Sequence, residues 1–358
     1  MPSSADAGTA SVGASSELWS VVADLIERRP VTLPLPLDVL RVVRRDGLAL
    51  RVVEALASPV DDAESLRQKD VLVHAAREGS GRALLAASKT ASLSEAARSV
   101  GVRALFYKGV PLSVQLGEGQ ASRPGADIDM LVAWRDVPRV AALLVQSGYS
   151  LKPRYRTVPP LLERLLECER TYSGPRPSVD LHWAVTGVGF EASFADLWAR
   201  RATVTIAGTD VATLDPVDAA LVSCVHGWRE LWASTKWLVD VGRQLVGLRD
   251  QWPQIVRRAY ECRCSVALAA TVDLLGAIGV ALPPVTGRPH DGDTSRAVAA
   301  VLTDDTPTPF TAGQWHEGSA RTRLRGSVAE RRRDRARMWA LGAGRRAWRS
   351  VAPPEASP

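Results

Sequence analysis

The chain has 358 residues, of which 46% are hydrophobic and 23% are charged, the proportions of an ordinary globular protein. This composition excludes a wholly disordered chain, a collagen-like fibre and a disulfide-dense miniprotein. A chain of this length usually folds as two domains, or as one large domain with appendages.

The net charge of +6 comes from one segment near the C-terminus. Arg321–Arg349 holds 11 arginines against Glu330 and Asp334, a net charge of +9, so the rest of the chain carries −3. Such a run either follows the phosphates of a nucleic acid or forms the solvated face of a helix. Binding of nucleic acid therefore stays an open alternative, and this segment is the part of the chain that would carry it.

The first hundred residues predict a tail followed by helices. Residues 1–16 are small and polar, so we expect a disordered tail. Apolar residues then recur at helical spacing through residues 17–99, which predicts an N-terminal helical region. The N-terminus shows neither the basic nor the apolar region of a signal peptide, so we expect a cytoplasmic protein whose four cysteines are free thiols.

Residues 100–215 mix short apolar runs with turn residues and predict the core domain. Asp136 is expected to cap a helix that runs to Leu144. The expected strands are 103–107, 127–132, 149–156, 167–172, 179–183, 202–206 and 210–214, of which the last two form a hairpin.

Helical spacing returns in residues 216–282, which we expect to form a helical domain. Its longest apolar stretch, Val266–Val285, contains Asp273 and predicts a buried helix rather than a membrane span. Residues 283–358 are loop-rich and end in a basic helix over Val328–Trp348. The order of elements predicts an α+β protein, a small mixed sheet flanked by N-terminal and C-terminal helical regions.

Two aspartates in one expected strand are the sharpest chemical signal. Asp127 and Asp129 alternate with Ile128, so both carboxylates project from the same face of the strand. Two adjacent carboxylates repel each other unless a cation neutralises them, and Mg²⁺ prefers oxygen ligands of this kind. The alternative is that both lie on a solvated edge and bind nothing.

A third carboxylate follows in the strand 179–183. Asp180 and His182 share one face there, opposite the apolar residues between them. If this strand lies beside the first, Asp180 joins Asp127 and Asp129, and three carboxylates can hold two metal ions.

These blocks resemble a known family. The segments Tyr107–Leu112, Arg123–Val132, Gly148-Tyr149 and Val179–Trp183 are similar to the Leu-Lys-Gly, Arg-Pro-x-x-Asp-Ile-Asp, Gly-Tyr and Asp-Leu-His-Trp blocks of a bacterial nucleotidyltransferase family in the DNA polymerase beta-like superfamily. The resemblance implies a nucleotidyltransferase palm in which Asp127, Asp129 and Asp180 act as catalytic metal ligands. It also implies an NTP substrate and Mg²⁺ (or Mn²⁺) as the cofactor.

The nucleotide-binding turn departs from the superfamily pattern. A Gly-Ser turn is usual there, whereas this chain has Lys108-Gly109, with Ser113 on the following helix. Lys108 is predicted to bind phosphate or to lie on the surface. Arg123 is predicted to bind phosphate or to order its own loop by pairing with an acid.

Four further residues are predicted to line the cleft or to have structural roles. His182 either transfers a proton or holds a carboxylate. His226, Lys236 and Asp240 lie in the helical region, where Lys236 and Asp240 are spaced for an ion pair on one helix face. The nearby tryptophans are expected in the core rather than as a base-stacking platform; they are Trp228, Trp232 and Trp237.

The sequence thus predicts a Mg²⁺-dependent enzyme that moves a nucleoside monophosphate from an NTP such as ATP to a hydroxyl, with release of pyrophosphate. The acceptor is a small molecule, a peptide or protein, or an RNA 3′ end. Two alternatives stay open: a non-catalytic binding protein with the same fold, and a toxin-like tRNA nucleotidyltransferase that uses the basic C-terminal helix.

Overall fold

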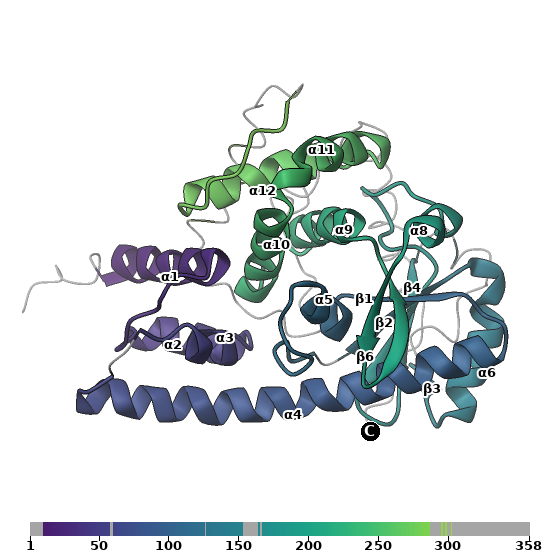
Figure 1. The fold of residues 1–358 in the computed structure, drawn as a ribbon, viewed down its shortest axis with the longest axis horizontal. Coiled ribbons are helices and arrows are strands. Elements are labelled where there is room, and N and C mark those ends of the chain that lie inside the picture. Colours follow the sequence, from purple (N-terminus) through teal and green to yellow (C-terminus); the bar gives the residue numbers. More distant parts are fainter. Residues whose placement is uncertain are drawn as a thin grey trace, which may run out of the picture.

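The computed structural model describes residues 10–57, 60–125, 127–152, 164, 167–286, 295, 298 and 302. The helices surround a small sheet, and the long helix α4 runs beneath both the N-terminal helices and the sheet (Figure 1). The basic segment Arg321–Arg349 and the expected helix Val328–Trp348 lie outside the described residues.

Four helices precede the sheet: α1 (Ala10–Glu27), α2 (Leu37–Arg45), α3 (Ala49–Glu54) and α4 (Ala63–Ser99). Helix α1 begins within the segment that was expected to be a tail. Helix α4 is one uninterrupted helix of 37 residues, because no proline breaks it and Asp62 caps its start by accepting from the amides of Glu64 and Ser65.

The sheet has five strands: β1 (Ala104–Tyr107), β2 (Asp127–Val132), β3 (Ser150–Leu151), β4 (Glu169–Ser173) and β5 (Ser178–His182). Their order is β1-β2-β5-β4-β3, with β2 and β5 parallel and the other pairs antiparallel. The expected mixed sheet is confirmed. The third strand is shorter than predicted, and residues 153–156 of that prediction lie outside the described part.

Short helices and a hairpin complete the middle of the chain: α5 (Gly109–Gln115), η1 (Trp134–Asp136), α6 (Val137–Gln146), α8 (Phe194–Arg200), β6 (Ala202–Ile206) and β7 (Thr209–Thr213). The hairpin of β6 and β7 is confirmed and forms a sheet of its own. Asp136 is at the N-cap position of α6, as predicted, but its carboxylate accepts no capping bond, because the residue is already in a 3₁₀ turn.

The C-terminal helices are α9 (Pro216–Arg229), α10 (Thr235–Gly247), η3 (Arg249–Gln251), α11 (Trp252–Glu261) and α12 (Ser265–Ala277). The expected buried apolar helix is α12, whose side chains from Val266 to Leu275 are largely covered. Within the described residues, no helix combines the length and the hydrophobicity needed to cross a membrane.

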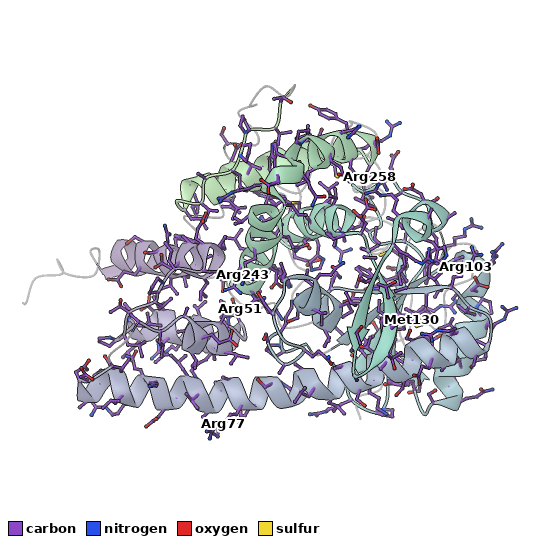
Figure 2. The ribbon with its side chains drawn as sticks, viewed as in Figure 1. Arg51, Arg77, Arg103, Met130, Arg243 and Arg258 are labelled. Atoms are coloured by element: carbon purple, nitrogen blue, oxygen red, sulfur yellow. The ribbon has the colours of Figure 1, made fainter. Side chains whose placement is uncertain are left out.

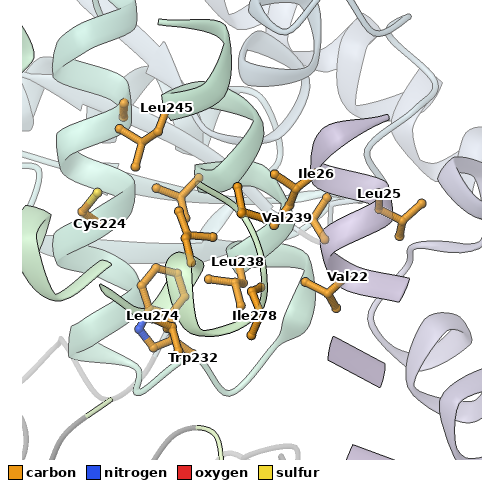
Figure 3. Packing of buried hydrophobic residues seen from close by; sticks show 14 of the residues in the cluster. Val22, Leu25, Ile26, Cys224, Trp232, Leu238, Val239, Leu245, Leu274 and Ile278 are labelled. Atoms are coloured by element: carbon orange, nitrogen blue, oxygen red, sulfur yellow. The ribbon is translucent and has the colours of Figure 1, made fainter. Parts of the chain in front are cut away.

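One hydrophobic core joins the two helical regions. Val22 and Ile26 of α1 pack toward Leu238 and Val239 of α10, while Leu25 extends from the other side of α1 (Figure 3). Helix α10 can approach this closely because it carries a glycine at the contact: a Cβ at Gly242 would lie 2.7 Å from Ile26. The N-terminal and C-terminal helices therefore stabilise each other, while the predicted domain boundaries stay a prediction.

The sheet separates this core from a second one. Leu105, Tyr107 and Leu131 belong to the core shared by the helical regions, whereas alternate residues such as Phe106 and Met130 pack with α4 and α6. Since side chains alternate along a strand, every polar residue in register with Tyr107 or Leu131 faces the C-terminal helices. The carboxylates of β2 and β5 lie on this face.

Candidate active site on the sheet

Strand pairing places two of the three aspartates directly opposite each other. Asp129 of β2 and Asp180 of β5 are Cα partners in the parallel pair, and Asp127 lies two residues before Asp129 at the exposed start of β2. The predicted neighbourhood of the two strands is therefore confirmed, and all three side chains project from one face.

Asp129 is the centre of the cluster. Its Oδ1 accepts from Lys108 Nζ at 2.9 Å and lies 3.0 Å from His182 Nε2, and only 7% of the residue is exposed. Burial alone would raise the pKa of this carboxyl, but the charges of Lys108 and His182 hold it well below its usual range. Asp129 is therefore ionised throughout the physiological range.

His182 is held between two carboxylates. Its Nδ1 lies 3.3 Å from Glu169 Oε2, on the side opposite Asp129. Burial lowers the pKa of His182, yet the hydrogen bond to Asp129 and the charges of Glu169 and Asp129 outweigh it and raise the pKa to about 10. The ring is therefore protonated at neutral pH and positions Asp129.

Glu169 is a site residue that the sequence reasoning missed. It pairs with His182 across β4 and β5, so its side chain shares the face of the aspartates. Burial would raise the pKa of Glu169, but His182 lowers it overall. Glu169 alternates with Thr171, which predicts that the two side chains share a face of β4. The sequence does not show which face this is, because that depends on the register between β4 and β5.

Asp180 carries the unsatisfied part of the cluster. Its Oδ1 is buried and has no hydrogen-bond partner among the described residues. Burial raises the pKa of Asp180 to about 6. The hydrogen bond with Thr171 lowers this pKa, whereas the negative charges of Glu169 and Asp129 raise it further. Although Asp127 is exposed at the strand end, desolvation by the surrounding protein and the charge of Asp129 raise its pKa as well.

These oxygen donors fit a divalent cation. A hard cation such as Mg²⁺ takes carboxylate oxygens, and it would give the buried Oδ1 of Asp180 a partner. The three aspartates do not form one tight set as they stand, because in the described chain the group of three such ligands within 4.8 Å of one another is Cys168, Glu169 and His182. That group does not suit a metal, since His182 is protonated at neutral pH and a protonated ring has no lone pair to offer a cation.

The Lys108-Gly109 turn delivers an ammonium group to the same place. Both residues have positive φ angles, 58° and 39°, a conformation that strains a lysine backbone. Burial lowers the pKa of Lys108, but Asp129 outweighs it and raises the pKa. Gly109, Asp127 and Asp129 line one small cavity together with Arg123.

Ser113 does not face the site. It is fully buried on α5, and its hydroxyl donates to the carbonyl of Gly119 at 3.0 Å. The hydroxyl therefore fixes the loop that leads to β2.

Arg123 lies in a buried ion-pair network beside the site. Its Nε donates to Asp240 of α10 at 2.7 Å, and Asp240 also pairs with Arg51 of α3 at 2.8 Å. Arg51 pairs with Glu118 at 2.8 Å, and Arg243 bonds to Glu118 as well. Arg51 and Arg243 approach each other between α3 and α10 (Figure 2).

The network fixes the charge of Asp240. Burial raises its pKa, but Arg123 and Arg51 outweigh burial and lower it. The expected i,i+4 pair with Lys236 is not formed: the ion pairs of Asp240 within the described residues are with the two arginines. Lys236 instead donates to the carbonyl of Pro124 at 3.2 Å, and burial lowers its pKa to about 8.

Helix α9 closes the site from the other side. His226 stacks edge-on against Trp237, and burial together with Lys108 and Arg229 lowers the pKa of His226 well below its usual value. Arg229 was not singled out from the sequence; it pairs with Glu230 at 2.9 Å, and its charge acts on Glu169. Trp228 and Trp232 are core residues, as expected.

The chain matches the family described as "Uncharacterised nucleotidyltransferase" over residues 36–278. It therefore belongs to this nucleotidyltransferase family, which confirms the resemblance seen in the sequence blocks.

Among solved structures, the chain is similar to an antigenic nucleotidyltransferase-like protein from Paracoccidioides brasiliensis, with 13% identity and a TM-score of 0.33 over 55% of this chain and 93% of that one. No curated protein matches the chain.

Proposed function

We propose that this protein is a Mg²⁺- or Mn²⁺-dependent nucleotidyltransferase that transfers a nucleoside monophosphate from an NTP to a hydroxyl acceptor. The observation that carries the proposal is the register of β2 and β5, which sets Asp129 opposite Asp180 on the face that also carries Asp127. Membership of the nucleotidyltransferase family supports it.

Asp127, Asp129 and Asp180 would hold the metal. A bound divalent cation supplies positive charge to the triphosphate and to the acceptor hydroxyl. The buried, partnerless Oδ1 of Asp180 and the carboxylate-rich face are the features of this chain that call for such a cation.

Proton transfer, charge neutralisation and positioning fall to different side chains of the site. The acceptor oxygen forms a bond to the α-phosphorus while the bond to pyrophosphate breaks, and the hydroxyl proton passes to the carboxylate of Asp180, which lies opposite Asp129 on the same face. Lys108 lies 2.9 Å from Asp129 and would neutralise the departing phosphate charge. His182 stays protonated and keeps Asp129 in place.

Arg123 contributes by positioning under this proposal. Because its Nε is bonded to the buried Asp240, it anchors the loop that enters β2 at Asp127. This favours the second of the two roles that the sequence left open for it.

Pyrophosphate release from each of the four NTPs, with Mg²⁺ and a panel of small hydroxyl compounds, peptides and RNA, tests the function. We expect D129N to lose more than about 100-fold in rate, since a charged ligand is removed from the reacting centre. The matched control is D70N, an exposed aspartate on α4 that should keep full activity. Equal rates in wild type and D129N would refute the assignment of the site.

A non-catalytic binding protein is the second candidate. The observation that favours it is that Lys108 and His182 already neutralise Asp129 without a metal. Binding of NTP with no pyrophosphate release, under every acceptor in the panel, would establish it.

A further inference from the structure

A cavity of about 360 Å³ lies outside the carboxylate site, between α2, α3 and the middle of α4. Its size falls within the range of small-molecule sites. It is too small for a folded partner.

Four of the fourteen residues that line this cavity are arginines: Arg41, Arg44, Arg45 and Arg82. Arg45 pairs with Asp46 at 2.7 Å, whereas the other three have no ion pair within the described part of the chain. The one acid in the lining, Glu78, faces the imidazole of His74 at 3.3 Å. The lining holds four arginines and one glutamate, a net positive charge that favours an anion, and the planar guanidinium groups suit phosphate oxygens.

One wall of the cavity is the loop that enters the catalytic strand. Pro124 packs against two glycines there: a Cβ at Gly47 would lie 2.8 Å from Pro124 Cγ, and one at Gly79 would lie 3.3 Å away. Lys236 holds the carbonyl of Pro124 from α10. Asp127 follows three residues later, so its Cα lies within about 11 Å of that of Pro124.

We propose that this arginine-lined cavity binds a phosphate group carried by the acceptor, so that the acceptor hydroxyl reaches Asp127, Asp129 and Asp180. The inference rests on the proposed function and adds a class of acceptor to it, a phosphorylated molecule. The phosphates of the NTP belong at the carboxylates, beside Lys108, because the reacting phosphorus must lie there. A separate anion site one short loop away therefore serves the second substrate.

Isothermal titration of the full chain, without NTP or metal, tests the binding step. The probes are inorganic phosphate, ribose 5-phosphate and uncharged ribose, each at low and high salt. We expect ribose 5-phosphate to bind at least as well as inorganic phosphate, ribose not to bind, and affinity to fall with salt.

The variant is R44Q/R82Q, which removes two exposed arginines without an ion pair and is expected to fold normally. We expect it to bind ribose 5-phosphate at least about 10-fold more weakly, the loss of charged hydrogen bonds to phosphate. The matched control is R77Q: Arg77 is on the same helix but points away from the body of the protein (Figure 2). It should bind within about twofold of wild type, and circular dichroism checks that both variants are folded.

Three outcomes overturn the inference: no binding of either phosphate probe, equal binding by wild type and R44Q/R82Q, or binding of inorganic phosphate without ribose 5-phosphate. The last would assign the cavity to free phosphate. D129N should bind ribose 5-phosphate normally. Binding intact with no nucleotidyl transfer thus counts against the proposed function alone, and transfer without binding counts against the cavity alone.

Discussion

Two clusters of charged residues lie next to each other in this protein, and they differ in their ratio of acidic to basic groups. On the sheet, Asp127, Asp129, Asp180 and Glu169 outnumber the cations among them, and one buried carboxylate oxygen has no partner. Between α3 and α10, Arg51, Arg123 and Arg243 surround Glu118 and Asp240, and both carboxylates are paired. The second cluster is built for stability, and the first lacks a cation.

Removing a carboxylate should therefore have opposite effects in the two clusters. In the paired network, D240N leaves Arg123 buried without its counter-charge and Arg51 with Glu118 alone. We expect a loss of about 3–5 kcal/mol in the free energy of unfolding, the range for one partner removed from a buried ion pair. Urea denaturation measures it. E64Q, which removes an exposed pair with Arg67, should change little.

On the sheet, D180N should abolish function without harming the fold. The raised pKa of Asp180 means that its ionised form is disfavoured in the folded protein, so a neutral amide removes that penalty at pH 7. We expect nucleotidyl transfer to fall by more than about 100-fold, roughly 2.7 kcal/mol of barrier. We also expect Mn²⁺ affinity, followed by electron paramagnetic resonance, to fall.

Stability of D180N at pH 7 should equal or exceed that of the wild type. A D180N protein as destabilised as D240N would show that the two clusters are not different in kind.

Lys236, which lies beside both clusters, should make the stability of the folded protein depend on pH. Burial, and then the charge of Arg123, lowers its pKa from 10.5 to about 8, so the folded protein holds fewer protons than the unfolded chain between these values. Stability of the wild type should therefore rise with pH from about 8 to 10.5, by at most about 1.4 kcal/mol per pH unit. K236M lacks this titration, so the wild-type minus K236M difference isolates it, and a flat difference would contradict the lowered pKa.

Local sequence pattern was enough to find the strands and aspartates, because alternation along a strand is read without knowing its neighbours. Asp127 and Asp129 were predicted to share a face on that ground. Asp180 was to join them if its strand lay beside the first, and β2 and β5 do lie side by side. Glu169 and Arg229 were missed, since only the register of β4 and the approach of α9 bring them to the site. Arg123 had two readings in the sequence because its partner Asp240 lies 117 residues away.

The smallest expected effect concerns Pro124, which connects the two clusters. Gly79 and Gly81 are both on α4, and alanine in a helix is normally more stable than glycine by about 0.5–1 kcal/mol. A Cβ at Gly81 meets open space, so G81A should gain that amount. A Cβ at Gly79 would lie 3.3 Å from Pro124 Cγ, and Pro124 cannot yield freely because Lys236 holds its carbonyl. G79A should therefore be about 1 kcal/mol less stable than G81A in urea denaturation. Equal stability of the two variants would mean that the loop into β2 moves freely, and that the arginine-lined cavity and the carboxylates are not held in a fixed relation.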